Sequence, residues 1–236
     1  MLGWRARADL DLGDWSAAAE AALEVLSRKR AAAVTRITTL AVLARVRVRR
    51  GDPGVPAALE EAQSLAAPTG ELQRIGPAEC AGAEAAWLDG DAGLVARITD
   101  PVLELALRRR ARWTIDELSC WRRRAGIEDD PPADAADPYL LELSGDWARA
   151  AEAWERIGCP YQRALALASS EDEHPLQTAL AELERLGANP VAERLIVAEK
   201  TVDHHVSAIL RKLGVRNRGE ASAEGVRRGL IAPAPS

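Results

Sequence analysis

Four Gly-Asp pairs divide the first 186 residues of this 236-residue chain, and they constrain its fold more than any other feature. The pairs are Gly13-Asp14, Gly51-Asp52, Gly90-Asp91 and Gly145-Asp146. Glycine is favoured where a helix ends because it adopts the left-handed conformation, and aspartate is favoured as the cap of the next helix. The first two intervals, 38 and 39 residues, lie in the range of tetratricopeptide-like and related helical repeats. The pairs therefore predict an array of antiparallel helices.

Alanine-rich amphipathic segments follow these turns. The segment 15–23, which begins at Trp15, is echoed by 147–154, which begins at Trp147. Small side chains allow paired helices to approach closely, while Leu and Trp fill the grooves between them. Aromatic residues make up only 4% of the chain and Phe is absent, which favours closely packed helices over a thick aromatic core. We expect the seven tryptophans to lie mainly in the core of the array.

The turn and cap signals predict an all-α fold with a tetratricopeptide-like array over 1–186. A loop is expected over 126–137, where Asp129-Asp130-Pro131-Pro132 interrupts the helical pattern. The arginines at 108–110 and 122–124 are expected to be solvated cations near helix C-termini. The predicted helices cover 2–11, 15–28, 32–50, 55–66, 71–89, 91–107, 114–124, 138–144, 147–157, 160–169 and 173–186.

The pattern changes after Gly187. Asn189 followed by Pro190 predicts a helix start, with Asn189 as the cap and a short helix through Ile196. A tight turn at 197–198 and a longer helix over 199–213 complete a helix-turn-helix unit in fewer than thirty residues. A further helix is expected from a capping box at Asn217 through Arg228. We therefore assign 187–230 to a small helix-turn-helix region and 231–236 to a disordered tail.

The segment 199–213 has two unlike faces when it is drawn as a helix. An apolar arc suited to a core is formed by Val202, Val206, Ile209, Leu210 and Leu213. A polar arc of similar width is formed by Lys200, Asp203, His204, Ser207 and Arg211. A helix that packs by one side and exposes short hydrogen-bonding groups on the other is what reading of the DNA major groove requires.

The charge distribution agrees with a nucleic-acid partner for this end of the chain. The net charge is -5, yet residues 190–230 carry eight Lys and Arg against five Asp and Glu. The three cysteines, Cys80, Cys120 and Cys159, have no metal-ligand spacing, so we expect reduced thiols in a cytoplasmic protein. No apolar run approaches the roughly 20 residues of a membrane span. We expect no membrane association.

Sequence signatures of catalysis are absent. The chain contains no GxxxxGK[ST], HExxH, GxSxG or GxGxxG motif. His204 and His205 are adjacent, so on a helix their side chains point about 100° apart and cannot grip one metal ion together. We therefore expect no enzymatic activity, no cofactor and no metal.

Residues 191–230 closely resemble the DNA-binding domain of LuxR-type bacterial transcription regulators. The similarity is carried by Ala192-Glu193-Arg194-Leu195, by the continuous segment 199–215, and by Arg216-Asn217-Arg218. The helical array is also similar to the C-terminal repeats of the large ATP-binding regulators of that family. The segments that carry this second similarity are Gly51-Asp52-Pro53, 68–74 and 83–91.

The resemblance implies roles for individual residues of the 199–213 helix. Asp203, His204 and Ser207 match positions that face bases in the major groove. Lys200, Thr201, Arg211 and Lys212 match or adjoin positions that contact phosphate. The polar arc of the helix contains all of these residues except Thr201 and Lys212. Those two lie at its flanks, where contacts to the DNA backbone are expected.

The chain also departs from the family pattern. Family members place a scaffold helix, opening with a Leu-Thr-x-Arg-Glu type sequence, before the helix-turn-helix unit, and nothing like it occurs here. We expect a shortened relative that lacks this helix and the N-terminal ATPase domain. The helix 176–186 is a candidate replacement, because Leu176, Leu180, Leu183 and Leu186 form an apolar stripe. It would be either withdrawn from the array or shared with it.

Two functions follow from these expectations. The first is a LuxR-type regulator that binds double-stranded DNA, as a homodimer or with help, since one short reading helix makes few base contacts. The second is a protein-interaction module, or a degraded regulator fragment, that binds a peptide or a full-length regulator and reads DNA poorly.

Overall fold

A computed structural model describes residues 2–28, 30–129, 138–196, 220 and 227. The chain divides into two compact units, Met1–Ala192 and Glu193–Ser236. The predicted boundary after residue 186 lies six residues before this division. Within the described ranges the regular structure is entirely helical, and none of these helices is long and apolar enough to cross a membrane.

The helices of the first unit follow the predicted order, and their ends agree with the prediction within two residues. The only additional element in the described ranges is a short 3-10 helix, η1. The elements are α1 (Leu2–Asp11), α2 (Trp15–Ser27), α3 (Ala33–Arg50), α4 (Val55–Ala66), η1 (Ala67–Thr69), α5 (Leu72–Leu88), α6 (Ala92–Arg109), α7 (Arg112–Arg124), α8 (Tyr139–Leu143), α9 (Trp147–Ile157), α10 (Pro160–Leu167) and α11 (Glu173–Leu186).

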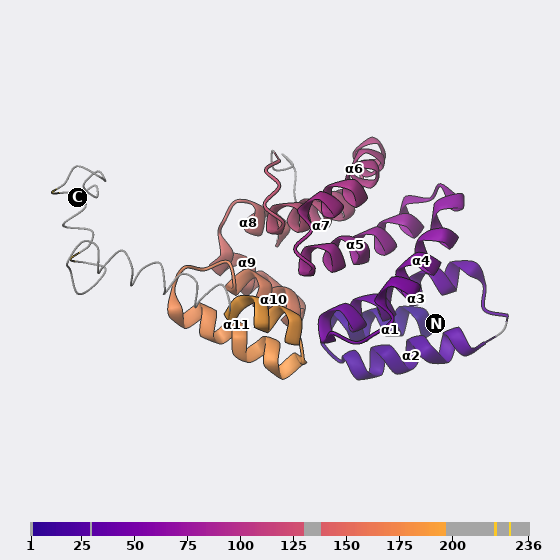
Figure 1. Cartoon of the computed structure of the whole chain (residues 1–236), viewed down its shortest axis with the longest axis horizontal. Helices are drawn as coiled ribbons and strands as arrows, with labels where there is room; N and C mark the ends of the chain where they lie inside the picture. The colour runs from indigo at the N-terminus through magenta and orange to yellow at the C-terminus, as the bar shows by residue number, and fades with distance from the viewer. Residues whose placement is uncertain (1, 29, 130–137, 197–219, 221–226, 228–236) are drawn as a thin grey trace. The chain divides into compact units, whose positions relative to one another are not determined.

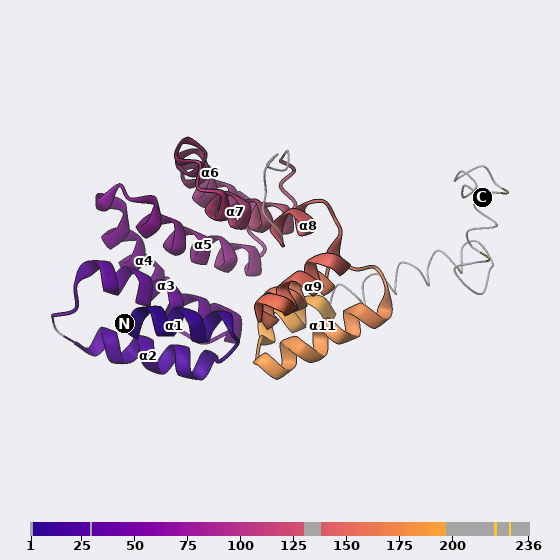
Figure 2. The same cartoon turned by 180° about the vertical axis from the view of Figure 1, so that it is seen from behind.

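Successive helices pack as antiparallel pairs, and the odd-numbered helices from α1 to α7 also pack on each other (Figure 1). Helix α1 contacts α3, α3 contacts α5, and α5 contacts α7, while α2, α4 and α6 each pack beside their chain neighbours. Helices α9, α10 and α11 form a further packed group in which α10 contacts both others (Figure 1). Figure 2 shows α9 and α11 from behind. The all-α fold is thus confirmed, and the tetratricopeptide-like character of the array stays a prediction.

The Gly-Asp turns have the predicted glycine conformation at all four positions and the predicted aspartate cap at three of them. Gly13, Gly51, Gly90 and Gly145 all have positive φ. Asp14, Asp91 and Asp146 cap the following helices, accepting hydrogen bonds from backbone amides at 3.0, 2.7 and 3.3 Å. The predicted cap at Asp52 is wrong, because α4 begins at Val55, as predicted, and Gly54 is its N-cap.

Four of the seven tryptophans lie in the core, as expected for most of them. Trp15, Trp87, Trp121 and Trp154 are buried. Trp147 is half-buried, and the remaining two, Trp4 and Trp113, are exposed.

The arginine runs differ from each other. Residues 108–110 are exposed, in agreement with the prediction. The prediction for 122–124 is wrong at Arg122, which is buried, donates to Thr99 Oγ1 at 2.8 Å and pairs with Asp100 at 2.5 Å. Arg124 is also drawn inward, where it pairs with Glu142. The acidic partners lie on other helices or loops, so the sequence of the run itself does not reveal them.

Candidate nucleic-acid interface

The approach to the predicted DNA-binding region is a tight reversal after α11. Gly187 ends the helix with φ 73°. Its amide donates to the Glu184 carbonyl at 3.0 Å, and the Ala188 amide donates to the Leu183 carbonyl at 2.8 Å. Only a residue tolerant of the left-handed conformation satisfies these helix-terminal carbonyls in this way.

The next helix spans the described residues 189–196. Its first hydrogen bond runs from the Ala192 amide to the Ala188 carbonyl at 3.0 Å, so Ala188 is the cap. The predicted cap, Asn189, is therefore wrong by one residue and is the first helical residue instead. Pro190 remains in the first turn, where its missing N–H costs no helical hydrogen bond.

This helix is docked on the array by its first turn. Ala188, Val191 and Ala192 are all buried. Pro190 lies against the turn after α3, where a Cβ added at Gly51 would come within 3.3 Å of the Pro190 ring. The first half of the helix therefore belongs physically to the repeat unit.

The second half of the same helix is less covered. Glu193 and Arg194 are exposed, and Leu195 and Ile196 are half-buried. Apolar residues at 191, 192, 195 and 196 share one face of a helix. That face is therefore buried at its start and partly accessible at its end.

Helix α11, the candidate replacement for the scaffold helix, is a member of the array. Leu183 and Leu186 are buried, whereas Leu176 and Leu180 are half-buried. Leu186 fits against the α1–α2 turn, where a Cβ at Gly13 would lie 2.8 Å from its Cδ2 atom. The arrangement in which α11 leaves the array is not the one observed, and sharing of α11 with the DNA-binding region stays a prediction.

The predicted DNA-contacting residues fall outside the described part of the chain. They are Lys200, Thr201, Asp203, His204, Ser207, Arg211 and Lys212. The described residues Glu220 and Arg227, in the last predicted helix, are helical. The described geometry is therefore that of the segment before these residues, which we call the platform: the α11 turn and the helix 189–196.

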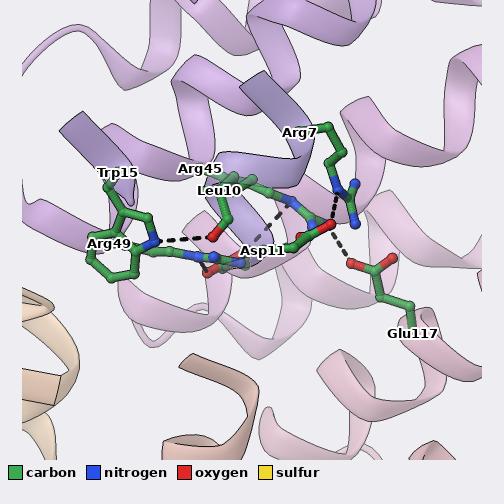
Figure 3. A network of polar contacts seen from close by, with 8 residues as sticks. Arg7, Leu10, Asp11, Trp15, Arg45, Arg49 and Glu117 are labelled. Carbon is green, nitrogen blue, oxygen red and sulfur yellow. Dashed lines mark hydrogen bonds and ion pairs between the residues drawn. The ribbon is translucent and has the colours of Figure 1, made fainter. Parts of the chain in front are cut away.

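A buried network of ion pairs, which was not predicted from the sequence, lies in the same unit (Figure 3). Arg49 of α3 donates to both carboxylate oxygens of Glu84 in α5, at 2.7 and 3.2 Å. One turn earlier on α3, Arg45 pairs with Glu117 of α7 and approaches Glu84 at 3.7 Å. The network joins three odd-numbered helices through fixed charges.

The network also reaches α10, which connects to α11. The Arg49 guanidinium lies 3.9 Å from the ring centroid of Tyr161, and the Trp15 ring lies 5.6 Å from that of Tyr161. Cation–π and edge-to-face contacts of this kind are favourable when they are desolvated. The ion-pair network thus connects α3, α5 and α7 with α10, the helix that precedes α11 in the chain.

The pKa shifts in the network indicate structural charges. Burial by itself would lower the pKa of Arg45, but Glu117 and Glu84 outweigh it and the pKa is raised. Burial would likewise raise the pKa of Glu117, but Arg45 and Arg7 outweigh it and the pKa is lowered. Burial raises the pKa of the neighbouring Cys80 thiol. These shifts move all three groups away from proton exchange near pH 7, which suits a structural role.

A sequence signal for this network was available. Arg45 and Arg49 are four residues apart on α3 among Ala and Val, and Glu84 interrupts an alanine run. Charges on the apolar face of a helix require buried partners. Within the described ranges, no group of three His, Cys, Asp or Glu residues is placed to hold a metal, and the three cysteines are free thiols.

Within the described ranges the protein is helical up to the first helix after α11. Residues 186–223 match the family model described as bacterial regulatory proteins, luxR family. This segment is therefore a LuxR-family helix-turn-helix region, and at the level of the family it supports a DNA-binding transcription regulator. Searches of curated proteins and of solved structures found no match to the chain.

Proposed function

We propose that the chain is a non-enzymatic transcription regulator that inserts helix 199–213 into the DNA major groove. Base contacts come from Asp203, His204 and Ser207. Phosphate contacts come from Lys200, Thr201, Arg211 and Lys212. The observation that supports the proposal is the LuxR-family match over 186–223. Specific binding requires a homodimer or a further partner, because one short helix contacts few bases.

In this proposal the array takes over the bracing role of the absent scaffold helix. Val191 and Ala192 are buried in the first unit, which fixes the start of the first helix of the motif. Leu195 and Ile196, half-buried in the same helix, are left to pack against the apolar arc of helix 199–213. The apolar face of the first helix of the motif is thus shared between the array and helix 199–213, and no separate scaffold helix is needed to cover it.

The experiment that tests the proposal is selection of DNA from a random duplex library by the full chain, followed by anisotropy titrations at several salt concentrations. We expect the logarithm of the binding constant to fall linearly with the logarithm of salt concentration. Lys200→Ala with Arg211→Ala should make that slope shallower by about two, because two phosphate contacts are lost. Asp203→Ala with His204→Ala should relax the selected sequence instead.

A charge-matched control separates local contacts from general electrostatics. Arg97→Ala with Arg108→Ala removes two charges from the exposed side of α6 and should leave the salt slope unchanged. No enrichment of any sequence, or an equal change of slope in both double variants, contradicts major-groove reading by helix 199–213.

A second candidate is a protein-interaction module that pairs with a full-length regulator. It is favoured by one observation: the buried Val191 and Ala192 commit half of the first helix to the array. Light scattering of the chain mixed with a full-length regulator tests it. A stable hetero-complex together with no DNA binding supports this candidate over the first.

A further inference from the structure

The odd-numbered helices of the array enclose a cavity that is distant in sequence from the DNA-binding region. Its volume is about 580 Å³, and helices α1, α3, α5 and α7 supply all of its lining. Ligand-binding cavities commonly lie between 300 and 1,000 Å³. The residues that bear on its chemistry are Trp4, Arg7, Arg45, Gln73, Arg74 and Trp113.

The charged groups of the cavity wall are all cationic. Arg7, Arg45 and Arg74 line it, and none of the described lining residues carries a carboxylate. The first two already have acidic partners: Arg7 donates to Asp11 at 2.8 Å, and Arg45 pairs with Glu117. The third guanidinium, that of Arg74, has an N–H donor without a hydrogen-bond acceptor.

Arg74 is only weakly engaged by the protein. Its Nε lies 3.4 Å from a carboxylate oxygen of Glu71, a side chain that is 53% exposed. That Nε is buried and makes no hydrogen bond within the described structure. Buried donors without acceptors are costly, and an anionic ligand would satisfy them.

Two exposed indoles stand at the same cavity, one at each end of the helix series. Trp4 of α1 is 77% exposed and Trp113 of α7 is 49% exposed. Trp113 is held by an edge-to-face contact with Tyr139 at 5.0 Å, and Tyr139 packs in the same way on the buried Trp154. Trp113 is thus a braced, accessible aromatic surface beside the Arg74 donors.

We propose that this cavity binds a small planar aromatic carboxylate. The carboxylate pairs with the Arg74 guanidinium, whose planar fork matches its geometry. The ring packs against the Trp4 and Trp113 indoles, as aromatic pairs prefer offset or edge-on contact. The site is independent of the proposed DNA binding.

Calorimetric titration of the full chain with 2-naphthoate, and with neutral 2-naphthamide, tests the proposal. We expect saturable one-to-one binding, with 2-naphthoate bound about tenfold or more tighter than 2-naphthamide because only the carboxylate forms a charge-assisted pair. Arg74→Ala should abolish this preference. Trp113→Leu should weaken both ligands by a similar factor.

Arg97→Ala is the matched control, because Arg97 is an exposed arginine with a weak ion pair, 3.8 Å to Asp91, outside the cavity. It should retain the preference for 2-naphthoate. Circular dichroism confirms that each variant keeps its helix content. Equal affinity for both ligands, no saturable binding at millimolar concentration, or the same loss in Arg97→Ala as in Arg74→Ala would overturn the proposal.

Discussion

Glu84 is fully buried in α5, and both of its carboxylate oxygens accept hydrogen bonds from Arg49. The same carboxylate lies 3.7 Å from Arg45, whose closer partner is Glu117, so two buried carboxylates and two buried guanidiniums form one network. A buried ion network of this kind contributes little relative to apolar packing, but it is expensive to break, because the remaining charges lose their partner. Arg49 and Glu84 are 35 residues apart in the sequence, and Arg45 and Glu117 are 72 residues apart, so spacing along the sequence did not reveal the network.

Replacing Glu84 with Ala should therefore destabilise the array strongly. We expect a loss of about 3–5 kcal/mol in the free energy of unfolding, because Arg45 and Arg49 stay buried with less compensation. Urea denaturation followed by circular dichroism measures it. Glu104→Ala removes the partner of Arg108 in an exposed pair and should cost less than about 0.5 kcal/mol. Similar losses in the two variants contradict a structural role for the network.

The helices themselves were largely predictable, since their ends are marked by local chemistry. Left-handed glycines and side-chain caps act within a few residues of each other, so spacing in the sequence is enough to place them. The errors at Asp52 and Asn189 concern only which residue caps a helix: Gly54 caps α4, and Ala188 caps the helix after α11. The docking of turns against distant helices was not predictable from such signals.

Asp14 and Asp52 should contribute differently to the free energy of unfolding, because only Asp14 caps a helix. Asp14 accepts from the Ala17 amide at 3.0 Å, whereas Asp52 caps no helix. We expect Asp14→Ala to cost about 1 kcal/mol and Asp52→Ala less than about half of that. Thermal and urea unfolding of the two variants give the comparison. An equal cost at both sites would show that the Asp14 cap is not stabilising.

The turn glycines should also differ, because one of them is packed and another is free. Ala at Gly13, where φ is 86°, would place its Cβ 2.8 Å from both Leu186 and Pro160, while Ala at Gly70, where φ is 63°, would meet nothing within 4 Å. Gly70→Ala carries only the cost of a left-handed residue, about 1–2 kcal/mol. Gly13→Ala should cost more, and urea unfolding measures the difference. Equal losses would show that the α1–α2 turn does not press on α11.

At the scale of the whole molecule, the DNA-binding region begins inside the repeat unit. The family match starts at residue 186, but the first compact unit continues to Ala192. The sequence indicated the motif through a dense local resemblance, and it indicated the array through its turns. It did not indicate that the first helix of the motif packs on the array, since Gly51 and Pro190 meet across 139 residues of chain. Contacts of this kind join residues far apart in the sequence, which local signals do not report.

Val191 offers a test of whether this docking supports DNA binding. Val191→Asp places a charge at a buried position, and we expect the amides of 189–196 to lose hydrogen-exchange protection while α3 and α5 keep theirs. Asn189→Asp adds the same charge to an exposed position of the same helix and should leave protection intact. If the array braces the reading helix, DNA affinity should fall in Val191→Asp but not in Asn189→Asp. Loss of protection at 189–196 with unchanged DNA affinity would show that the motif folds without the array, because the docked turn would then be dispensable for reading DNA.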